Sequence, residues 1–132
     1  MILELEHRTR IPTRVGNYFV RVDNDGTIYA HQNAGEPTRA VDWTIDPAVA
    51  RCGTLEQPRQ VVERVLRKHG FFELAPLHEA SAAQDGVIRK LTYWDRQGAA
   101  RTVTVDRARV PELDRLVQKL LEALKLAEIP AS

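Results

Sequence analysis

The sequence predicts a single α+β domain, spanning residues 1–132, in which an antiparallel β-sheet of four to six strands carries two α-helices on one face. The chain has 132 residues, a length typical of one compact domain. Runs of alternating apolar and polar residues, typical of half-buried strands, occur in both halves of the chain. In each half, a strand–turn–strand pattern is followed by a segment with the apolar spacing of an amphipathic helix. A two-layer sandwich buries both apolar stripes against the sheet.

The first half of the chain is predicted to begin with strands. Residues 3–6 alternate two leucines with two glutamates, and this period of two indicates a strand. The β-rich runs at 18–22 and 27–31 flank an Asn- and Asp-rich turn that ends on Gly26, so they are predicted to form a hairpin. Residues 41–45 alternate again, which is compatible with a short edge strand.

The first helix is predicted after residues 54–57, which have the spacing of a capping box, with Pro58 in its first turn. Gly70 follows where a helix C-cap favours glycine. Adjacent residues that leave a helix point in different directions. We therefore expect one of Phe71 and Phe72 to enter the core and the other to pack behind Gly70. The apolar stripe of this helix comprises Val62, Val65, Leu66 and His69.

The second half repeats the pattern more clearly. Strands are predicted at 87–94 and 100–105, joined by a second turn that contains Asp and Gly. Pro111 opens a helix with acidic residues in its first turn and lysines further on, which matches the helix dipole. The continuity of its apolar stripe predicts burial against the sheet, together with Leu66 and Val103. The stripe comprises Leu113, Leu116, Val117, Leu120, Leu121 and Leu124.

Composition argues against several classes of function. Nineteen Lys and Arg against eighteen Asp and Glu leave a formal charge of +1, so a chain-wide basic field for nucleic acid or anionic membrane is absent. The single cysteine, Cys52, cannot form an internal disulfide or supply a cysteine-based zinc site. No apolar run approaches the ~20 residues of a membrane helix, and the N-terminus lacks the features of a signal peptide. We expect a cytoplasmic protein without membrane association.

The sequence carries no pattern typical of an enzyme or a metal site. The four histidines show no H-x-H or H-x-x-x-H spacing, and residues 23–26 match only part of a calcium loop. Neither Ser81 nor Ser132 lies in a nucleophile elbow. Cys52 precedes a helix, so it is either a reactive thiol near a helix dipole or a passive, partly buried one. The chain is therefore predicted not to be an enzyme and to use no metal or cofactor.

A basic segment, residues 7–21, supports an alternative function. It lacks acidic residues and contains four arginines: Arg8, Arg10, Arg14 and Arg21. Basic residues interleaved with aromatic ones bind single-stranded nucleic acid through phosphate contacts and stacking. A small nucleic-acid-binding domain is therefore one interpretation, and a scaffold or subunit without a separate activity is another.

Several short segments after Val65 follow one another in a characteristic order. They are 71–74 directly after a helix, 91–94 at the end of a strand, Gly98, 101–105, and 110–113 at the start of a leucine-rich helix. In this pattern the second half of the chain resembles the emfourin family, small bacterial protein inhibitors of thermolysin-like metalloproteases. The resemblance implies an antiparallel sheet with two helices, and inhibition by a loop or strand edge inserted into the substrate cleft. Residues 10–16 differ from the glycine-rich segment of that family.

The favoured function is a non-enzymatic module that binds another protein. The resemblance to the emfourin family makes this more specific: the partner is then a thermolysin-like metalloprotease, which the chain inhibits. The candidate contact loop is residues 9–17, because it lacks periodicity while the sheet occupies the residues on either side. Arginines that flank an apolar residue suit an interface anchor, and a proline limits the entropy lost on docking. A variable connector between strands is the alternative. The candidate contact residues are Arg10, Ile11, Pro12 and Arg14.

Overall fold

The structure, a computed structural model, describes residues 1–9, 17–33, 51–79 and 87–126. The strands are β1 (Leu3–Thr9), β2 (Asn17–Val22), β3 (Thr27–Asn33), β4 (Arg51–Thr54), β5 (Leu77–Glu79), β6 (Val87–Trp94) and β7 (Ala100–Asp106). The helices are α2 (Pro58–Lys68) and α3 (Pro111–Ala123), and a short 3-10 helix, η1 (Phe71–Glu73), follows α2. Within the described ranges, no helix is long and apolar enough to cross a membrane.

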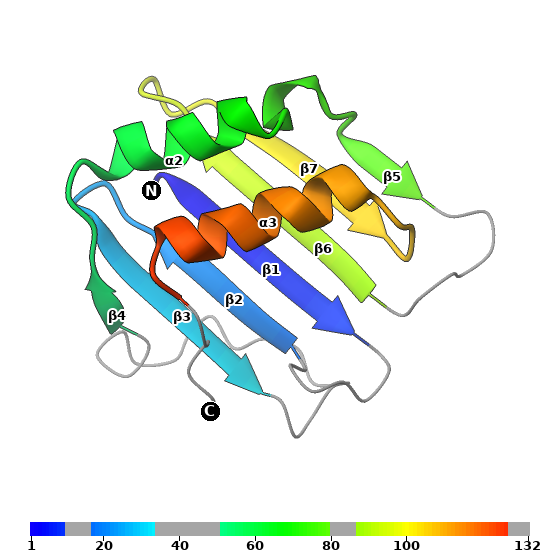
Figure 1. The fold of residues 1–132 in the computed structure, drawn as a ribbon, viewed down its shortest axis with the longest axis horizontal. Coiled ribbons are helices and arrows are strands. Elements are labelled where there is room, and N and C mark those ends of the chain that lie inside the picture. Colours follow the sequence, from blue (N-terminus) through cyan, green and yellow to red (C-terminus); the bar gives the residue numbers. More distant parts are fainter. Residues whose placement is uncertain (10–16, 34–50, 80–86, 127–132) are drawn as a thin grey trace.

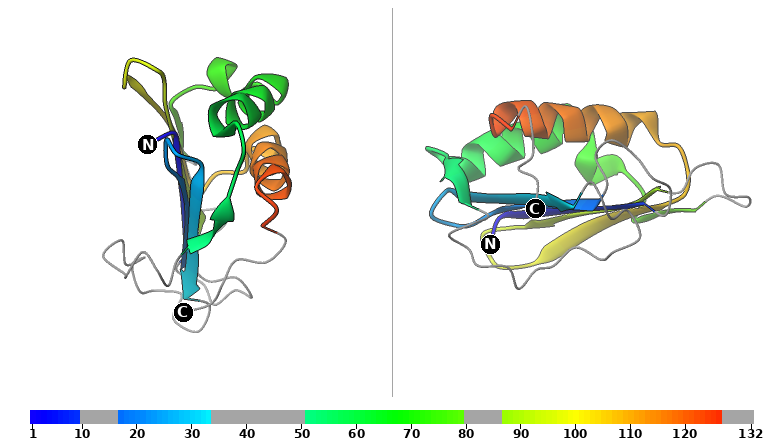
Figure 2. Two further views of the ribbon diagram at one scale, coloured as in Figure 1. Left: turned by 90° about the vertical axis from the view of Figure 1, so that its left-hand side faces the viewer. Right: turned by 90° about the horizontal axis from the view of Figure 1, so that it is seen from below.

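The strands form one sheet with the order β4-β3-β2-β1-β6-β7-β5 (Figure 1). Neighbouring strands are antiparallel except β5, which runs parallel to β7. Figure 2 shows α2 and α3 in a second layer, on the same side of the sheet. The architecture is α+β with a mostly antiparallel sheet, as the sequence predicts.

The prediction of four to six strands is wrong, because the described residues alone form a sheet of seven. The two edge strands, β4 and β5, account for the difference and have only four and three residues. Strands this short are too brief for an alternating pattern to stand out. The edge strand expected at residues 41–45 lies outside the described residues.

The alternation along β1 divides the sheet into two faces. Leu3 and Leu5 lie opposite Val22 and Val20 of β2, and all four are buried in the same cluster as the helix residues. The two glutamates of β1 therefore point to the opposite face of the sheet.

Both predicted hairpin turns form. The Gly26 amide donates a hydrogen bond to the Asp23 carbonyl at 2.9 Å, and the Gly98 amide donates to the Asp95 carbonyl at 3.0 Å. The φ angles of these glycines are 90° and 83°, in the region that favours glycine.

The start of α2 differs from the prediction. Thr54 belongs to β4, so it forms no capping box with Gln57. Gln57 is itself the N-cap residue, has a left-handed φ of 49° and makes no side-chain cap hydrogen bond. Pro58 is the first helical residue, as expected, because its fixed φ suits that position.

The predicted core is confirmed. The members of the α3 stripe pack with residues of α2 and of the central strands into one hydrophobic cluster. Each of the following is at most 4% exposed: Leu116, Val117, Leu120, Leu124, Leu66 and Val103.

Of the two phenylalanines after α2, one enters the core, as predicted. Phe71 is fully buried, whereas Phe72 is half-buried at the rim of the core. Their rings meet edge to face with centroids 5.3 Å apart, and Phe72 meets Tyr93 in the same way at 5.7 Å. Gly70, with a φ of 74°, turns the chain from α2 into η1.

Candidate protein-binding site

The residues predicted to contact a partner are Arg10, Ile11, Pro12 and Arg14, and they lie outside the described residues. The end of β1 before them is described: Thr9 lies opposite Val87, the first residue of β6. The C-terminal end of β1 therefore lies beside the N-terminal end of β6. The role of this loop stays a prediction.

A groove lies at the opposite end of the sheet, where β6 ends at Trp94. The β2–β3 turn, the start of α2 and the β6–β7 turn surround it. Its volume is about 780 Å³, and it is open to solvent. The residues that line it are mostly apolar or carry amide or guanidinium groups, and they include Ile2, Trp94, Gln57, Gln60, Arg59 and Arg96.

The β6–β7 turn forms a tightly hydrogen-bonded structure beside the groove, here called the 95–98 tip. The Asp95 Oδ1 accepts hydrogen bonds from the backbone amides of Gln97 and Ala99, both at 2.9 Å. The Asp95 amide in turn donates to the Ala99 carbonyl at 3.0 Å. The side chains of Arg96 and Gln97 are exposed. In Figure 2 (left) this yellow tip extends past the neighbouring strand ends.

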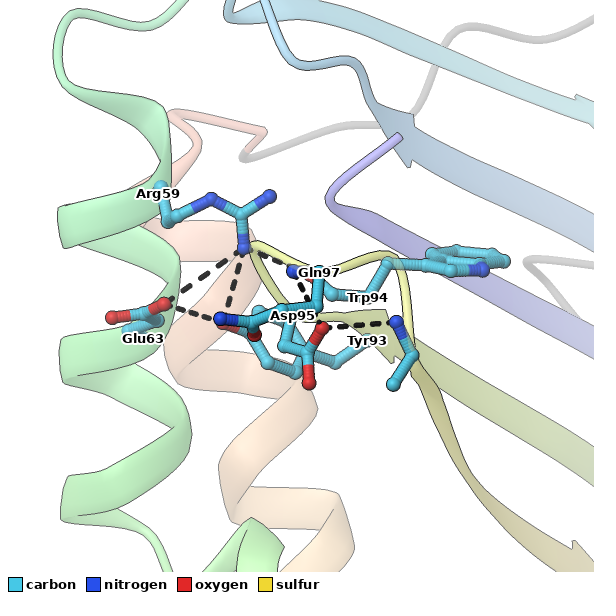
Figure 3. A network of polar contacts seen from close by, with 7 residues as sticks. Arg59, Glu63, Tyr93, Trp94, Asp95 and Gln97 are labelled. Carbon is cyan, nitrogen blue, oxygen red and sulfur yellow. Dashed lines mark hydrogen bonds and ion pairs between the residues drawn. The ribbon is translucent and has the colours of Figure 1, made fainter.

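Arg59 ties the base of the tip to α2 (Figure 3). Its Nη1 donates to the Trp94 carbonyl at 2.8 Å and to the Tyr93 hydroxyl at 3.2 Å. The same Nη1 lies 3.8 Å from the Oε1 of Glu63, one helical turn further along α2. The Tyr93 hydroxyl donates to that Glu63 carboxylate. One guanidinium thus bridges two elements that are far apart in the sequence.

The Tyr93 hydroxyl links β6 to α2 through Arg59 and Glu63. Burial and the hydrogen bond to Glu63 both raise the pKa of Tyr93 above its ordinary value. The phenol therefore stays protonated at neutral pH, and its proton is engaged by the carboxylate. This arrangement holds the strand against the helix rather than supplying an acid or a base.

The groove has the chemistry of a binding surface. Among the described residues that line it there is no Ser, Thr, Cys or His that could act as a nucleophile or a base. Asp95 supplies the carboxylate of the described lining. The Oδ1 of Asp95 is engaged by the turn. The Trp94 side chain is half-buried and points away from α2 (Figure 3). Trp, Arg and Met, which all line this groove, are enriched at protein interfaces.

Two histidines of the sheet, His7 and His31, make ring contacts with the neighbouring strand. His7 stacks on Tyr18 with ring centroids 4.5 Å apart, and His31 lies against Phe19 at 5.9 Å. In the part of the chain that the structure describes, no three His, Cys, Asp or Glu side chains come together as a metal site.

A polar cluster at the other end of the sheet was not predicted from the sequence. Arg89 of β6 donates from Nε to the Nδ1 of His7 at 3.3 Å, and its Nη1 binds the carboxylate of Asp114 on α3. Burial raises the pKa of Tyr18, on which His7 stacks. The sequence does contain one indication of this cluster. His7 continues the alternation of Leu3 and Leu5, so it lies on the face of β1 that the helices cover.

The described part of the basic segment, residues 7–21, forms no concentrated basic patch. Arg8 lies 3.8 Å from Glu6, and Arg21 lies 3.6 Å from Glu4. These ion pairs run across the sheet face that is opposite the helices. Each of these two arginines therefore lies near a carboxylate on that face, and nucleic-acid binding by the basic segment stays a prediction.

Cys52 is exposed, so it is not the buried thiol that one interpretation expects. Its Sγ donates to the Ala30 carbonyl at 3.8 Å, and desolvation of the sulfur raises the pKa of the thiol. Because the thiolate is the nucleophile, a raised pKa lowers reactivity at a given pH. We expect iodoacetamide at pH 8 to alkylate the folded chain more slowly than the urea-unfolded chain, in which Cys52 is again the only thiol. Equal rates in the two states would contradict this expectation.

No protein-family model, no curated protein and no solved structure matches the chain. Function must therefore be inferred from the geometry of the site.

Proposed function

We propose that the chain is a non-enzymatic protein-binding module that docks through the 95–98 tip and the adjacent groove. The observation that carries this proposal is the organisation of the tip before any partner is bound. Asp95 closes the turn from within, and Arg59 fixes its base to α2. A segment that is already ordered loses little conformational entropy on docking, which favours affinity.

The groove supplies the second part of the contact surface. A partner segment laid beside the tip meets the half-buried Trp94 and the guanidinium of Arg96. In the described part of the chain Arg96 has no ion-pair partner, so its charge is available to an acidic side chain or a carbonyl group. An aromatic side chain beside an exposed arginine is a common arrangement at the centre of an interface.

In its concrete form, the proposal is inhibition of a thermolysin-like metalloprotease by insertion of the tip into the substrate cleft. The resemblance to the emfourin family supports this form, because residues 91–94 and Gly98, which carry it, build the end of β6 and the tip itself. A narrow, projecting turn also has a suitable shape for a cleft.

Titration of a purified thermolysin-like metalloprotease tests this proposal. We expect the wild-type chain to abolish activity stoichiometrically, and the double variant R96A/Q97A to inhibit at least about tenfold more weakly, a loss of about 1.4 kcal/mol. The matched control is R64A, which removes an exposed arginine of α2 outside the groove. R64A should inhibit like the wild type. A protease that keeps its activity in excess wild-type chain contradicts the inhibitor form of the proposal.

The loop at residues 10–16 is the competing contact segment, and the same assay separates the two. The groove lies at the end of β6, whereas Thr9, the last described residue before the loop, is paired with Val87 at the start of β6. The alanine variants of the two segments therefore replace different residues and can be compared directly. If the triple variant R10A/I11A/R14A loses binding while R96A/Q97A keeps it, the loop is the contact and the tip is not. The reverse result assigns the contact to the tip and makes the loop a connector.

A further inference from the structure

A second cavity lies between the sheet and the start of α3, at the opposite end of β6 from the groove. Its volume is about 330 Å³, at the small end of the range for ligand pockets. The apolar part of its wall comprises Val87, Val105, Ala108, Val110, Pro111 and Leu113. The charged side chains that line it are Arg89, Arg109 and Asp114.

Arg89 is held in place at the inner wall of this cavity. Its Nε donates to His7, and its Nη1 is bonded to Asp114. His7 is itself fixed by stacking on Tyr18, with an angle of 10° between the rings. The Arg89 side chain is 23% exposed, so its charge lies in a partly desolvated position. Contacts with β1 and α3 therefore fix its orientation without a ligand.

Arg109 gives the cavity an excess of positive charge. It is exposed, it precedes α3, and within the described residues it has no ion-pair partner. The carboxylate of Asp114 is already bound to Arg89. Two guanidinium groups thus face one carboxylate, which leaves one positive charge without a counter-charge beside an apolar wall.

We propose that this cavity binds a small monocarboxylate with a branched apolar body. The carboxylate pairs with the guanidinium of Arg109, a geometry that allows two parallel hydrogen bonds. The apolar body lies against Val87, Ala108 and Pro111, the apolar lining residues that are not fully buried, and this contact removes its surface from water. A dianion is disfavoured because the Asp114 carboxylate lines the same cavity.

An NMR titration of the full chain with isovalerate tests the proposal, with isovaleramide as a probe of the same shape and no charge. We expect saturable shifts of the backbone amides of Ala108, Arg109 and Leu113 with isovalerate. Binding of isovaleramide should be at least about tenfold weaker, because it cannot pair with the guanidinium as an anion. Equal affinity for the two probes, or no saturable shift with isovalerate, overturns the proposal.

Two variants locate the binding to this cavity. R109Q should weaken isovalerate binding at least about tenfold, since it removes the unmatched charge. R115Q is the matched control, because Arg115 is an exposed arginine of α3 that does not line the cavity. It should bind like the wild type. An equal loss in both variants indicates attraction by surface charge alone and overturns the proposal.

A third variant, A108L, places a larger side chain in the cavity. It should abolish the isovalerate-induced shifts if the ligand binds inside the cavity.

The same chemistry can come from a free acid or from the C-terminus of a peptide that ends in leucine. A tetrapeptide ending in leucine with a free carboxylate, and its C-terminally amidated form, distinguish these sources. Tighter binding of the free-carboxylate peptide than of isovalerate identifies a peptide terminus, and weaker binding identifies a small acid. Either result supports carboxylate recognition when R109Q reduces it.

Discussion

Replacing Leu120 with alanine is expected to lower the free energy of unfolding by about 2–5 kcal/mol. Leu120 is 1% exposed and lies at the centre of the α3 stripe that packs on the sheet. The substitution removes buried methyl and methylene groups and leaves a cavity that close-packed neighbours fill only in part. Urea-induced unfolding, followed by circular dichroism at equal m-values, measures the change.

Leu77→Ala is the matched control for this experiment. Leu77 lies on the edge strand β5 and is 56% exposed, so its truncation removes little buried surface. We expect a change within about 0.5 kcal/mol, as for surface positions in general. If L120A costs no more than L77A, the packing of α3 against the sheet is not as described.

The fold was predictable from the sequence where short-range chemistry determines it. The two hairpins were predicted because Gly26 and Gly98 close turns between β-rich runs, and this requires no knowledge of distant residues. The apolar stripe of α3 also identifies its buried face directly, since one helical period places its leucines together.

The sheet edges and the start of α2 were not predictable in the same way. β4 and β5 are strands only because neighbouring strands supply hydrogen-bond partners, and three or four residues carry too little alternation to show this. Thr54 illustrates the conflict. Its spacing to Gln57 favours a capping box, but pairing with Thr27 of β3 places it in the sheet. Tertiary pairing outweighs the local capping signal.

The candidate site was only partly predictable. The 95–98 turn was expected as a turn, but its place beside a groove depends on three segments that are distant in the sequence. Arg59 was not singled out, because nothing near it in the chain indicates that it reaches the Trp94 carbonyl. The loop at residues 10–16 was chosen for its lack of periodicity, a property that marks a connector as readily as an interface.

The two turn glycines are expected to respond differently to alanine, although both have positive φ angles. At Gly98 an added Cβ would meet nothing within 4 Å, so G98A should cost about 1–2 kcal/mol, the penalty of a left-handed conformation. At Gly26 an added Cβ would lie 2.2 Å from the backbone carbonyl oxygen of Leu55. That oxygen cannot move without the backbone, so G26A should cost a further 1–3 kcal/mol, roughly the penalty of overpacking.

Hydrogen exchange locates the cause of this difference. The Leu55 amide donates to the Gly26 carbonyl at 2.8 Å, so displacement of Leu55 breaks the bond that holds the end of β4 to the β2–β3 turn. In G26A the Leu55 amide should exchange faster than in the wild type, whereas G98A should leave it unchanged because the 95–98 tip does not contact this bond. If both variants lose the same stability and protect Leu55 equally, the close approach of Gly26 to Leu55 makes no contribution, and the positive φ alone accounts for the two losses.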